Sequence, residues 1–184
     1  MLWIGRGGLL QAAAAATAPG LAADERASAA AELRCTGTEL VSLLDAFPRP
    51  QFELRNARPY NFLGRTLYSQ LMPRLRCPVA PALQQVQQDL ALEGLGLKVW
   101  DAVQEPRYVS DPAVNAGRDT RGSVVGVTLV NRRGKPLAMP TDYDDFSEAA
   151  HVDATGAPST AARNARRLRT DMERREFVPF QTEW

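Results

Sequence analysis

Apolar residues recur at helical spacing between positions 80 and 93. Leu83, Val86 and Leu90 are separated by three and four positions, so they fall on one face of a helix. Gly94 follows at once, and glycine adopts the left-handed conformation at a helix C-terminus more readily than any other residue. The pattern therefore predicts a helix over residues 80–93 that buries one face.

Shorter runs with high β-propensity predict strands on either side of the middle of the chain. Residues 97–100 and the valine-rich residues 123–130 are the clearest of these runs. Residues 131–134 contain Asn, two Arg and Gly, which predicts a turn, and a short strand or loop follows around Leu137. A last strand is predicted over residues 178–184.

Two further segments have helical character. Residues 27–47 precede Pro48 and are predicted to form a helix, although their apolar spacing is loose. Residues 159–175 are predicted to form a helix with Ser159 as its N-cap. Its inward positions are expected to be Ala161, Ala165, Leu168 and Met172. Helices and strands in this order indicate a mixed α+β domain, with helices packed on a small antiparallel sheet.

Composition narrows the function classes. The chain has 184 residues, of which 45% are hydrophobic, and this is the size of a single domain, expected over residues 27–184. The formal net charge is +1, from 22 basic and 21 acidic residues. Such a balance gives no general attraction to nucleic acid or to anionic lipid. No stretch is long and apolar enough to predict a membrane span.

The N-terminal residues 1–26 are expected to be a separate leader. Residues 21–23 (Leu-Ala-Ala) before Asp24 resemble a signal-peptidase site, which predicts a periplasmic or secreted protein. An alanine-rich leader without a targeting role, in a cytoplasmic protein, is the other interpretation. Cys35 and Cys77 lack zinc-ribbon spacing, so they either pair, if the protein is exported, or remain thiols.

Most of the chain, from about residue 54 to residue 184, resembles a known family of enzymes. The resemblance is carried by LRNARPYNFLGR at 54–65, LGLKVWDA at 95–102, GSVVGVTL at 122–129, MPTDYDDFSE at 139–148, NARRL at 164–168 and EFVPFQTEW at 176–184. Each motif is weak alone, but their order and spacing are similar to those of the zinc D-alanyl-D-alanine dipeptidases of the vancomycin-resistance type. The resemblance implies the D,D-peptidase, or hedgehog-like, zinc peptidase fold.

The resemblance also implies a set of catalytic positions. Zinc peptidases of this type hold the metal with three protein ligands, use a carboxylate as general base, and stabilise the oxyanion with a cation. Carried over by position, the first ligand falls on Asp119 and the second on Gly126, which has no side chain. The third, a histidine, falls after Trp184, where the sequence stops, so a C-terminally truncated member is expected. The general base falls on Glu183, and the oxyanion-binding arginine falls near Gln104.

This donor set leads to two functional hypotheses. In the first, the protein is a D-alanyl-D-alanine dipeptidase of cell-wall peptidoglycan metabolism, with zinc weakly bound or absent and with strongly impaired or no activity. Any remaining metal site would need a new arrangement, for example Asp119 with His151, the single histidine. In the second, the protein is a non-catalytic pseudopeptidase that binds peptidoglycan fragments or a protein partner. The acidic residues between 142 and 148 lack the calcium-loop pattern and are expected to form a solvent-facing loop.

Overall fold

A computed structural model of the protein describes residues 2–5, 33, 35–44, 51–61, 63–67, 73–102 and 122–183. The strands are β1 (Leu2–Gly5), β2 (Leu40–Ser42), β3 (Gln51–Phe52), β4 (Arg74–Arg76), β5 (Leu95–Asp101), β6 (Val124–Asn131) and β7 (Phe177–Pro179). The helices are η1 (Arg55–Ala57), α2 (Val79–Leu92), η3 (Glu148–Ala150) and α4 (Ser159–Glu173). The predicted mixed α+β class is confirmed.

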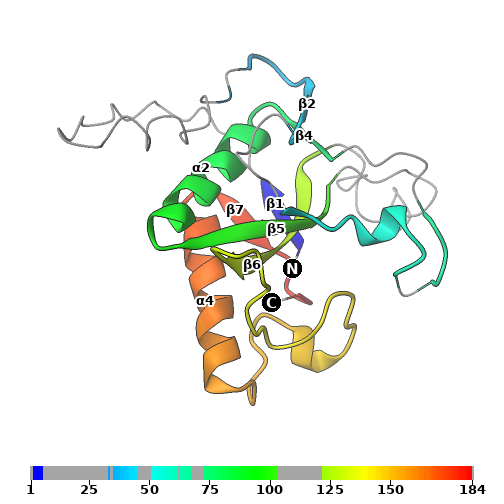
Figure 1. Ribbon diagram of the computed structural model, residues 1–184, viewed down its shortest axis with the longest axis vertical. Helices are drawn as coiled ribbons and strands as arrows, with labels where there is room; N and C mark the ends of the chain where they lie inside the picture. Colours follow the sequence, from blue (N-terminus) through cyan, green and yellow to red (C-terminus); the bar gives the residue numbers. More distant parts are fainter. Residues whose placement is uncertain are drawn as a thin grey trace.

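Five strands form the main sheet, in the order β3-β5-β6-β1-β7, and β2 pairs with β4 in a separate two-stranded sheet. All pairs in the main sheet are antiparallel except β3 and β5, which run parallel at one edge. The predicted strands at 97–100 and 123–130 are confirmed as parts of β5 and β6. The main sheet crosses the middle of the molecule, with both helices on the same side of it (Figure 1).

The helices α2 and α4 cover one face of this sheet. On β6, side chains alternate between the two faces, and Val125, Val127 and Leu129, each fully buried, join the core beneath the helices. Leu83 of α2 and Leu168 of α4 meet them there, also fully buried. The predicted helices at 80–93 and 159–175 are thus confirmed, with Pro158 rather than Ser159 at the N-cap of α4. Within the described residues, no helix combines the length and the apolar character that a membrane span requires.

Strand β1 occupies an interior position of the sheet, between β6 and β7. Trp3 is fully buried beneath the helices. Gly5 lies so close to α2 that a β-carbon there would stand 2.6 Å from a methyl group of Val79, so a larger residue cannot fit without movement. These residues fall inside the range expected to be a leader. The boundary at residue 26 stays a prediction, but four residues before it belong to the folded sheet.

Two sequence expectations were wrong in the described residues. The segment 27–47 contains a turn and strand β2 rather than a continuous helix. A disulfide between Cys35 and Cys77 and the pairing of β2 with β4 impose an extended conformation there, and such distant partners override a weak local preference. The last strand ends at Pro179, and a turn follows instead of an extended chain to residue 184.

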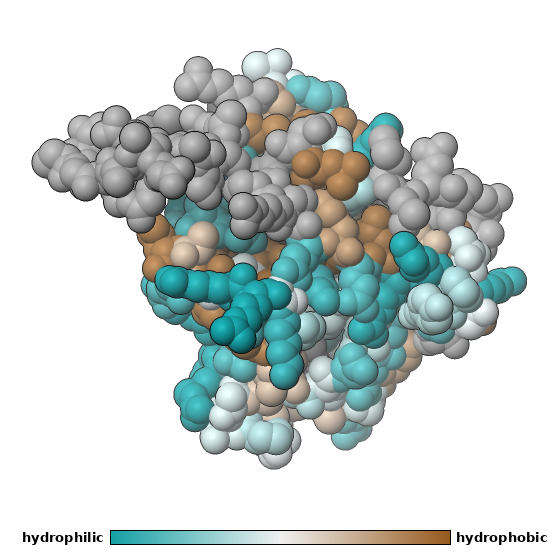
Figure 2. All heavy atoms as spheres, viewed as in Figure 1, coloured by the Kyte–Doolittle hydropathy of each residue, from teal (hydrophilic) through white to brown (hydrophobic). Residues whose placement is uncertain are grey.

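Much of the visible face is polar, and an apolar area lies near the small sheet. Figure 2 shows hydrophobic side chains gathered between the β2–β4 pair and η1. Among the exposed large hydrophobic residues are Leu40, Leu44, Tyr60 and Leu63. Because monomeric proteins rarely expose contiguous apolar patches without a purpose, this area is a candidate for contact with another molecule.

Candidate functional site

A β-bulge in β5 places the side chains of Trp100 and Asp101 at the same end of the sheet. The register between β5 and β6 shifts between Val99 and Asp101, so Trp100 has no partner in the ladder. Such a bulge re-aims the side chains beside it. Trp100 lines a cavity together with Thr128, and the β-carbon of Asp101 faces Gly126. The face of the sheet opposite the helices therefore acquires an aromatic ring and a carboxylate next to each other.

Asn56 joins this end of β5 to the loop that follows β6. Its side-chain amide donates hydrogen bonds to Asp101 Oδ2 and to the hydroxyl oxygen of Tyr143, both at 3.2 Å. Asn56 is only 6% exposed, so these bonds form in a largely dry environment where they hold geometry well. Three segments far apart in sequence thus meet at one buried amide.

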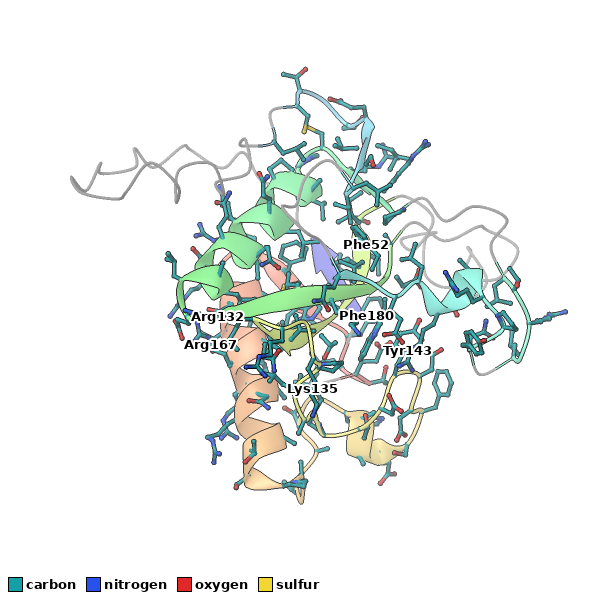
Figure 3. All side chains as sticks on the ribbon, viewed as in Figure 1. Phe52, Arg132, Lys135, Tyr143, Arg167 and Phe180 are labelled. Atoms are coloured by element: carbon teal, nitrogen blue, oxygen red, sulfur yellow. A yellow bond between two sulfur atoms is a disulfide. The ribbon has the colours of Figure 1, made fainter. Side chains whose placement is uncertain are left out.

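Two aromatic rings beside Asn56 contact each other, and an arginine lies over both of them. The rings of Trp100 and Tyr143 meet edge to face, with centroids 4.9 Å apart. The guanidinium of Arg55 lies 5.4 Å from the Trp100 ring and 5.3 Å from the Tyr143 ring. Tyr143 is labelled in Figure 3, close to the loop that follows β6. Because Arg55 begins η1, this short helix is fastened over the end of the sheet.

Glu183 sits in a small acidic pocket next to Tyr143. A turn after β7 positions it, since the Glu183 N–H donates to the carbonyl of Phe180 at 3.2 Å. The same turn is fixed to the loop after η3, because the Val152 N–H donates to the carbonyl of Gln181 at 3.1 Å. The walls of the pocket include Tyr143, Asp144 and Phe146. A carboxylate from the end of the chain is thus brought against the loop that follows β6.

Asp144 carries the signs of a functional carboxylate. Its backbone has a φ of 57°, which is unusual for a residue other than glycine. Its Oδ2 atom is buried and has no hydrogen-bond partner within the part of the chain that the structure describes. Burial, and next to it the negative charge of Glu183, raise the pKa of Asp144 to about 6, against smaller opposing effects of the N-terminal ammonium group and of Arg55. The expectation of a solvent-facing acidic loop is therefore wrong at Asp144, which the fold presses against a second carboxylate.

The sequence-predicted positions fall partly inside this site. Glu183 lies in the acidic pocket, and Gly126 lies next to Asp101 on the same end of the sheet. Asp119 and Gln104 lie outside the described residues. His151 lines a different cavity, with Arg166 and Arg169 of α4, and does not line the Glu183 pocket.

The described residues do not match the donor set that the resemblance implies for zinc. Position 126 offers no donor atom, and a β-carbon placed there would stand 3.3 Å from the β-carbon of Asp101. The described residues do hold one cluster with metal-binding chemistry, formed by Cys35, Glu39 and Cys77. Its two sulfur atoms are joined in the disulfide, so in this state they are not thiolate ligands.

Sequence reasoning missed the network around Asn56. Arg55, Asn56 and Tyr143 fall inside the matching motifs, but nothing in their spacing shows that they meet. Trp100 is only 5% exposed and packs in the core, yet it also forms a wall of the cavity beside Thr128. The available signal was the polar character of Asp101 at the end of an otherwise buried strand.

Comparisons with known proteins identify the family of this chain. Residues 111–184 match the peptidase M15 family model, described as D-ala-D-ala dipeptidase. The D-alanyl-D-alanine dipeptidase of Escherichia coli (strain K12) is 30% identical over 160 residues, which cover 80% of this chain and 82% of that protein. A D-alanyl-D-alanine dipeptidase of Enterococcus faecium is 25% identical over 157 residues, covering 67% of this chain and 78% of that protein. On the strength of the match along most of both chains, this protein belongs to the D-alanyl-D-alanine dipeptidase family.

Proposed function

We propose that this protein binds D-alanyl-D-alanine, or a peptidoglycan fragment of the same chemistry, and hydrolyses it very slowly or not at all. The observation that carries the proposal is the glycine at position 126. It stands beside Asp101 at the site, where the family resemblance implies a metal-binding carboxylate, and it supplies none. Glu183 and Asp144 line a pocket together.

Binding of a dipeptide is supported by the paired carboxylates. A free dipeptide carries an ammonium group at neutral pH, and a cation placed between two carboxylates relieves their repulsion. Burial and the charge of Glu183 outweigh the nearby positive charges and raise the pKa of Asp144, and its Oδ2 has no hydrogen-bond partner among the described residues. The ammonium group of the ligand is therefore expected to lie between Asp144 and Glu183.

Weak hydrolysis follows from the chemistry of water activation. Peptidases of this class lower the pKa of a bound water with a metal held by three protein ligands, and a carboxylate then accepts the proton. For the second role we propose Glu183, which lines the acidic pocket. With no donor at position 126, and with His151 in another cavity, the first role is not supported by the described residues.

An active zinc dipeptidase is the second candidate, favoured by one observation. The β-carbon of Asp101 faces position 126. The Asp101 carboxylate could therefore act as a metal ligand next to the position where the family resemblance implies one. Against this, Asp101 already accepts hydrogen bonds from Asn56 and from the Ala102 N–H. Its release would cost those bonds, so zinc affinity should be low.

Calorimetric titration with D-alanyl-D-alanine tests the binding part of the proposal. Saturable heat is expected with the D,D-dipeptide, and at least about tenfold weaker binding is expected for Asp144→Asn, because a charge-assisted contact is lost. Equal binding of the wild type and of Asp144→Asn would place the ligand elsewhere. Absence of any heat with the wild type would refute the proposal.

The hydrolysis part is tested by repairing position 126. Gly126→Asp supplies a carboxylate, and Gly126→Ala is its matched control, since both add the same β-carbon near Asp101. Zinc content and dipeptide turnover should rise in Gly126→Asp and not in Gly126→Ala. Stoichiometric zinc and rapid turnover in the wild type would instead favour the second candidate.

We further propose that the protein folds in an oxidising compartment, either the periplasm or the extracellular space. The support is the Cys35–Cys77 disulfide, because cytosolic proteins rarely contain such bonds. Residues Leu2–Gly5 must stay attached there, since β1 fills the sheet between β6 and β7. Mass spectrometry of the native protein after thiol alkylation should find both cysteines unlabelled and the N-terminal strand present.

A further inference from the structure

An open groove of about 530 Å³ lies beside β3 and is separate from the acidic pocket. Its apolar walls include Leu44, Phe52, Leu54 and Tyr60, and two arginines, Arg55 and Arg58, line it as well. Leu44 and Tyr60 are 48% and 74% exposed. This is the apolar area that Figure 2 shows between the β2–β4 pair and η1.

One wall of the groove is the free edge of the main sheet. β3 is the end strand of that sheet and pairs only with β5 within the described part of the chain. The pairing uses alternate residues, and the Glu53 N–H donates to the carbonyl of Val99 at 3.0 Å. Phe52, between Gln51 and Glu53, therefore directs its N–H and C=O away from β5, where no described residue bonds them. An edge of this kind can accept a further strand.

The groove is also positively charged. The carboxylate of Glu53 accepts hydrogen bonds from Lys98 at 2.8 Å and from Arg55 at 2.9 Å. Burial alone would raise the pKa of Glu53, but these two cations hold it below its usual range, so its charge is already matched. Arg58 is exposed and has no ion-pair partner among the described residues. The arginines thus outweigh the single acid of the groove.

The groove leads to the site. Glu53 and Arg55 line both the groove and the neighbouring cavity that contains Trp100 and Thr128. The buried Trp100 Nε1 and Thr128 Oγ1 have no hydrogen-bond partner among the described residues. A chain bound along β3 would therefore extend toward a region with unsatisfied polar groups, which is where a ligand contributes most.

We propose that the edge of β3 binds an extended acidic peptide, which adds to the main sheet as a sixth strand. Main-chain hydrogen bonds to Phe52 supply the alignment, apolar side chains of the peptide rest on Leu44 and Tyr60, and a carboxylate of the peptide pairs with Arg58. The inference goes beyond the proposed function, because it assigns a peptide site outside the Glu183 pocket and needs no hydrolysis.

Fluorescence anisotropy with labelled hexapeptides tests the proposal. The probe is a peptide of alternating Ala and Glu, and its controls are the same peptide with Lys in place of Glu and the same peptide with alternate backbone nitrogens methylated. The protein carries Glu183→Gln, so that hydrolysis cannot consume the probe. The Glu peptide should bind, while the methylated peptide should bind about tenfold more weakly because it loses main-chain hydrogen bonds.

Charge reversal provides the second arm. Arg58→Glu should weaken binding of the Glu peptide by about tenfold or more and improve binding of the Lys peptide. Arg163→Glu is the matched control, since Arg163 is an exposed arginine of α4 that does not line the groove. Failure of the Glu peptide to bind, equal binding of the methylated peptide, or an equal effect of both arginine variants would each overturn the proposal. Dipeptide binding in the Glu183 pocket is measured separately, so the two proposals fail independently.

Discussion

The two faces of the main sheet differ in what their side chains do. On the helix-covered face, Val125, Val127 and Leu129 of β6 are fully buried in one apolar core with α2 and α4. On the opposite face, the same strand presents Gly126 and Thr128, and the buried Thr128 hydroxyl has no hydrogen-bond partner among the residues that the structure describes. Apolar burial stabilises the fold, whereas buried polar atoms without a partner cost stability and persist where a ligand uses them. One side of β6 therefore packs in the core, and its other side lines the candidate site.

The charged side chains also differ between the helices and the site. Arg175 of the α4 C-terminus pairs with Asp89 of α2 at 2.6 Å, and Arg167 joins the buried Asp171 to Glu93, so the helices are tied by matched charges. Figure 3 shows Arg167 on the side of the molecule away from Tyr143. At the site, Asp144 faces Glu183, a pair of like charges. Opposite charges join the two helices, whereas like charges come close together at the site.

The largest effect is expected from β1, whose Trp3 belongs to the helix-covered face. Trp3→Ala should lower the free energy of unfolding by about 3–5 kcal/mol, because it empties a fully buried site. Trp3→Phe should cost much less, since the Trp3 Nε1 has no described partner. Urea denaturation measures both variants. A small effect of Trp3→Ala would mean that β1 is dispensable and that residues 1–26 behave as a separate leader.

Loss of the disulfide should come next. Cys35 and Cys77 are 42 residues apart, and opening a loop of that size is expected to lower the free energy of unfolding by about 4 kcal/mol. The double variant Cys35→Ser/Cys77→Ser should show this loss in urea denaturation. Treatment with a thiol reductant should reproduce it in the wild type and leave the variant unchanged. Sensitivity of the variant to the reductant would show that the loss has another origin.

A matched pair of valines compares the two faces directly. Val127 and Val130 are both buried on β6, but only Val127 belongs to the core under the helices. Val127→Ala should lower the free energy of unfolding by about 2 kcal/mol, and Val130→Ala by about 1 kcal/mol, because the site face can relax into nearby cavities. If thermal or urea denaturation showed an equal loss of unfolding free energy in both variants, the proposed difference between the two faces would be wrong.

The smallest expected effect is the pH dependence of Asp144. Its pKa is 3.8 in the ordinary case and about 6 in the folded protein, so the folded state holds a proton more tightly than the unfolded state. Stability should therefore decrease as pH rises from about 4 to about 6, and the cost is complete above that window. Asp144→Asn should be more stable than the wild type at neutral pH by about 1 kcal/mol, after allowance for solvent screening, and should show no gain below pH 4. A constant difference across this range would indicate a cause other than ionisation.

Local patterns accounted for the elements that depend on their own residues. The spacing of Leu83, Val86 and Leu90 predicted α2, and the valine run predicted β6, because periodic burial is visible in the sequence itself. The family resemblance predicted Glu183 as the general base, and this role stays a prediction, although Glu183 does line the acidic pocket. Nothing local predicted β1 or β2, since each is extended only because a distant strand pairs with it.

By itself, then, the sequence determined the family, the α+β class, the two main helices and the absence of a donor side chain at position 126. Only the tertiary structure decided that Asn56 joins Asp101 to Tyr143, that Asp144 meets Glu183, and that β3 is an edge strand beside a groove in the described part of the chain. The physical reason is the distance along the sequence between the residues that interact. Helical periodicity and side-chain chemistry are properties of neighbouring residues, whereas hydrogen bonds, raised pKa values and free strand edges depend on groups that chain folding brings together from dozens of residues away.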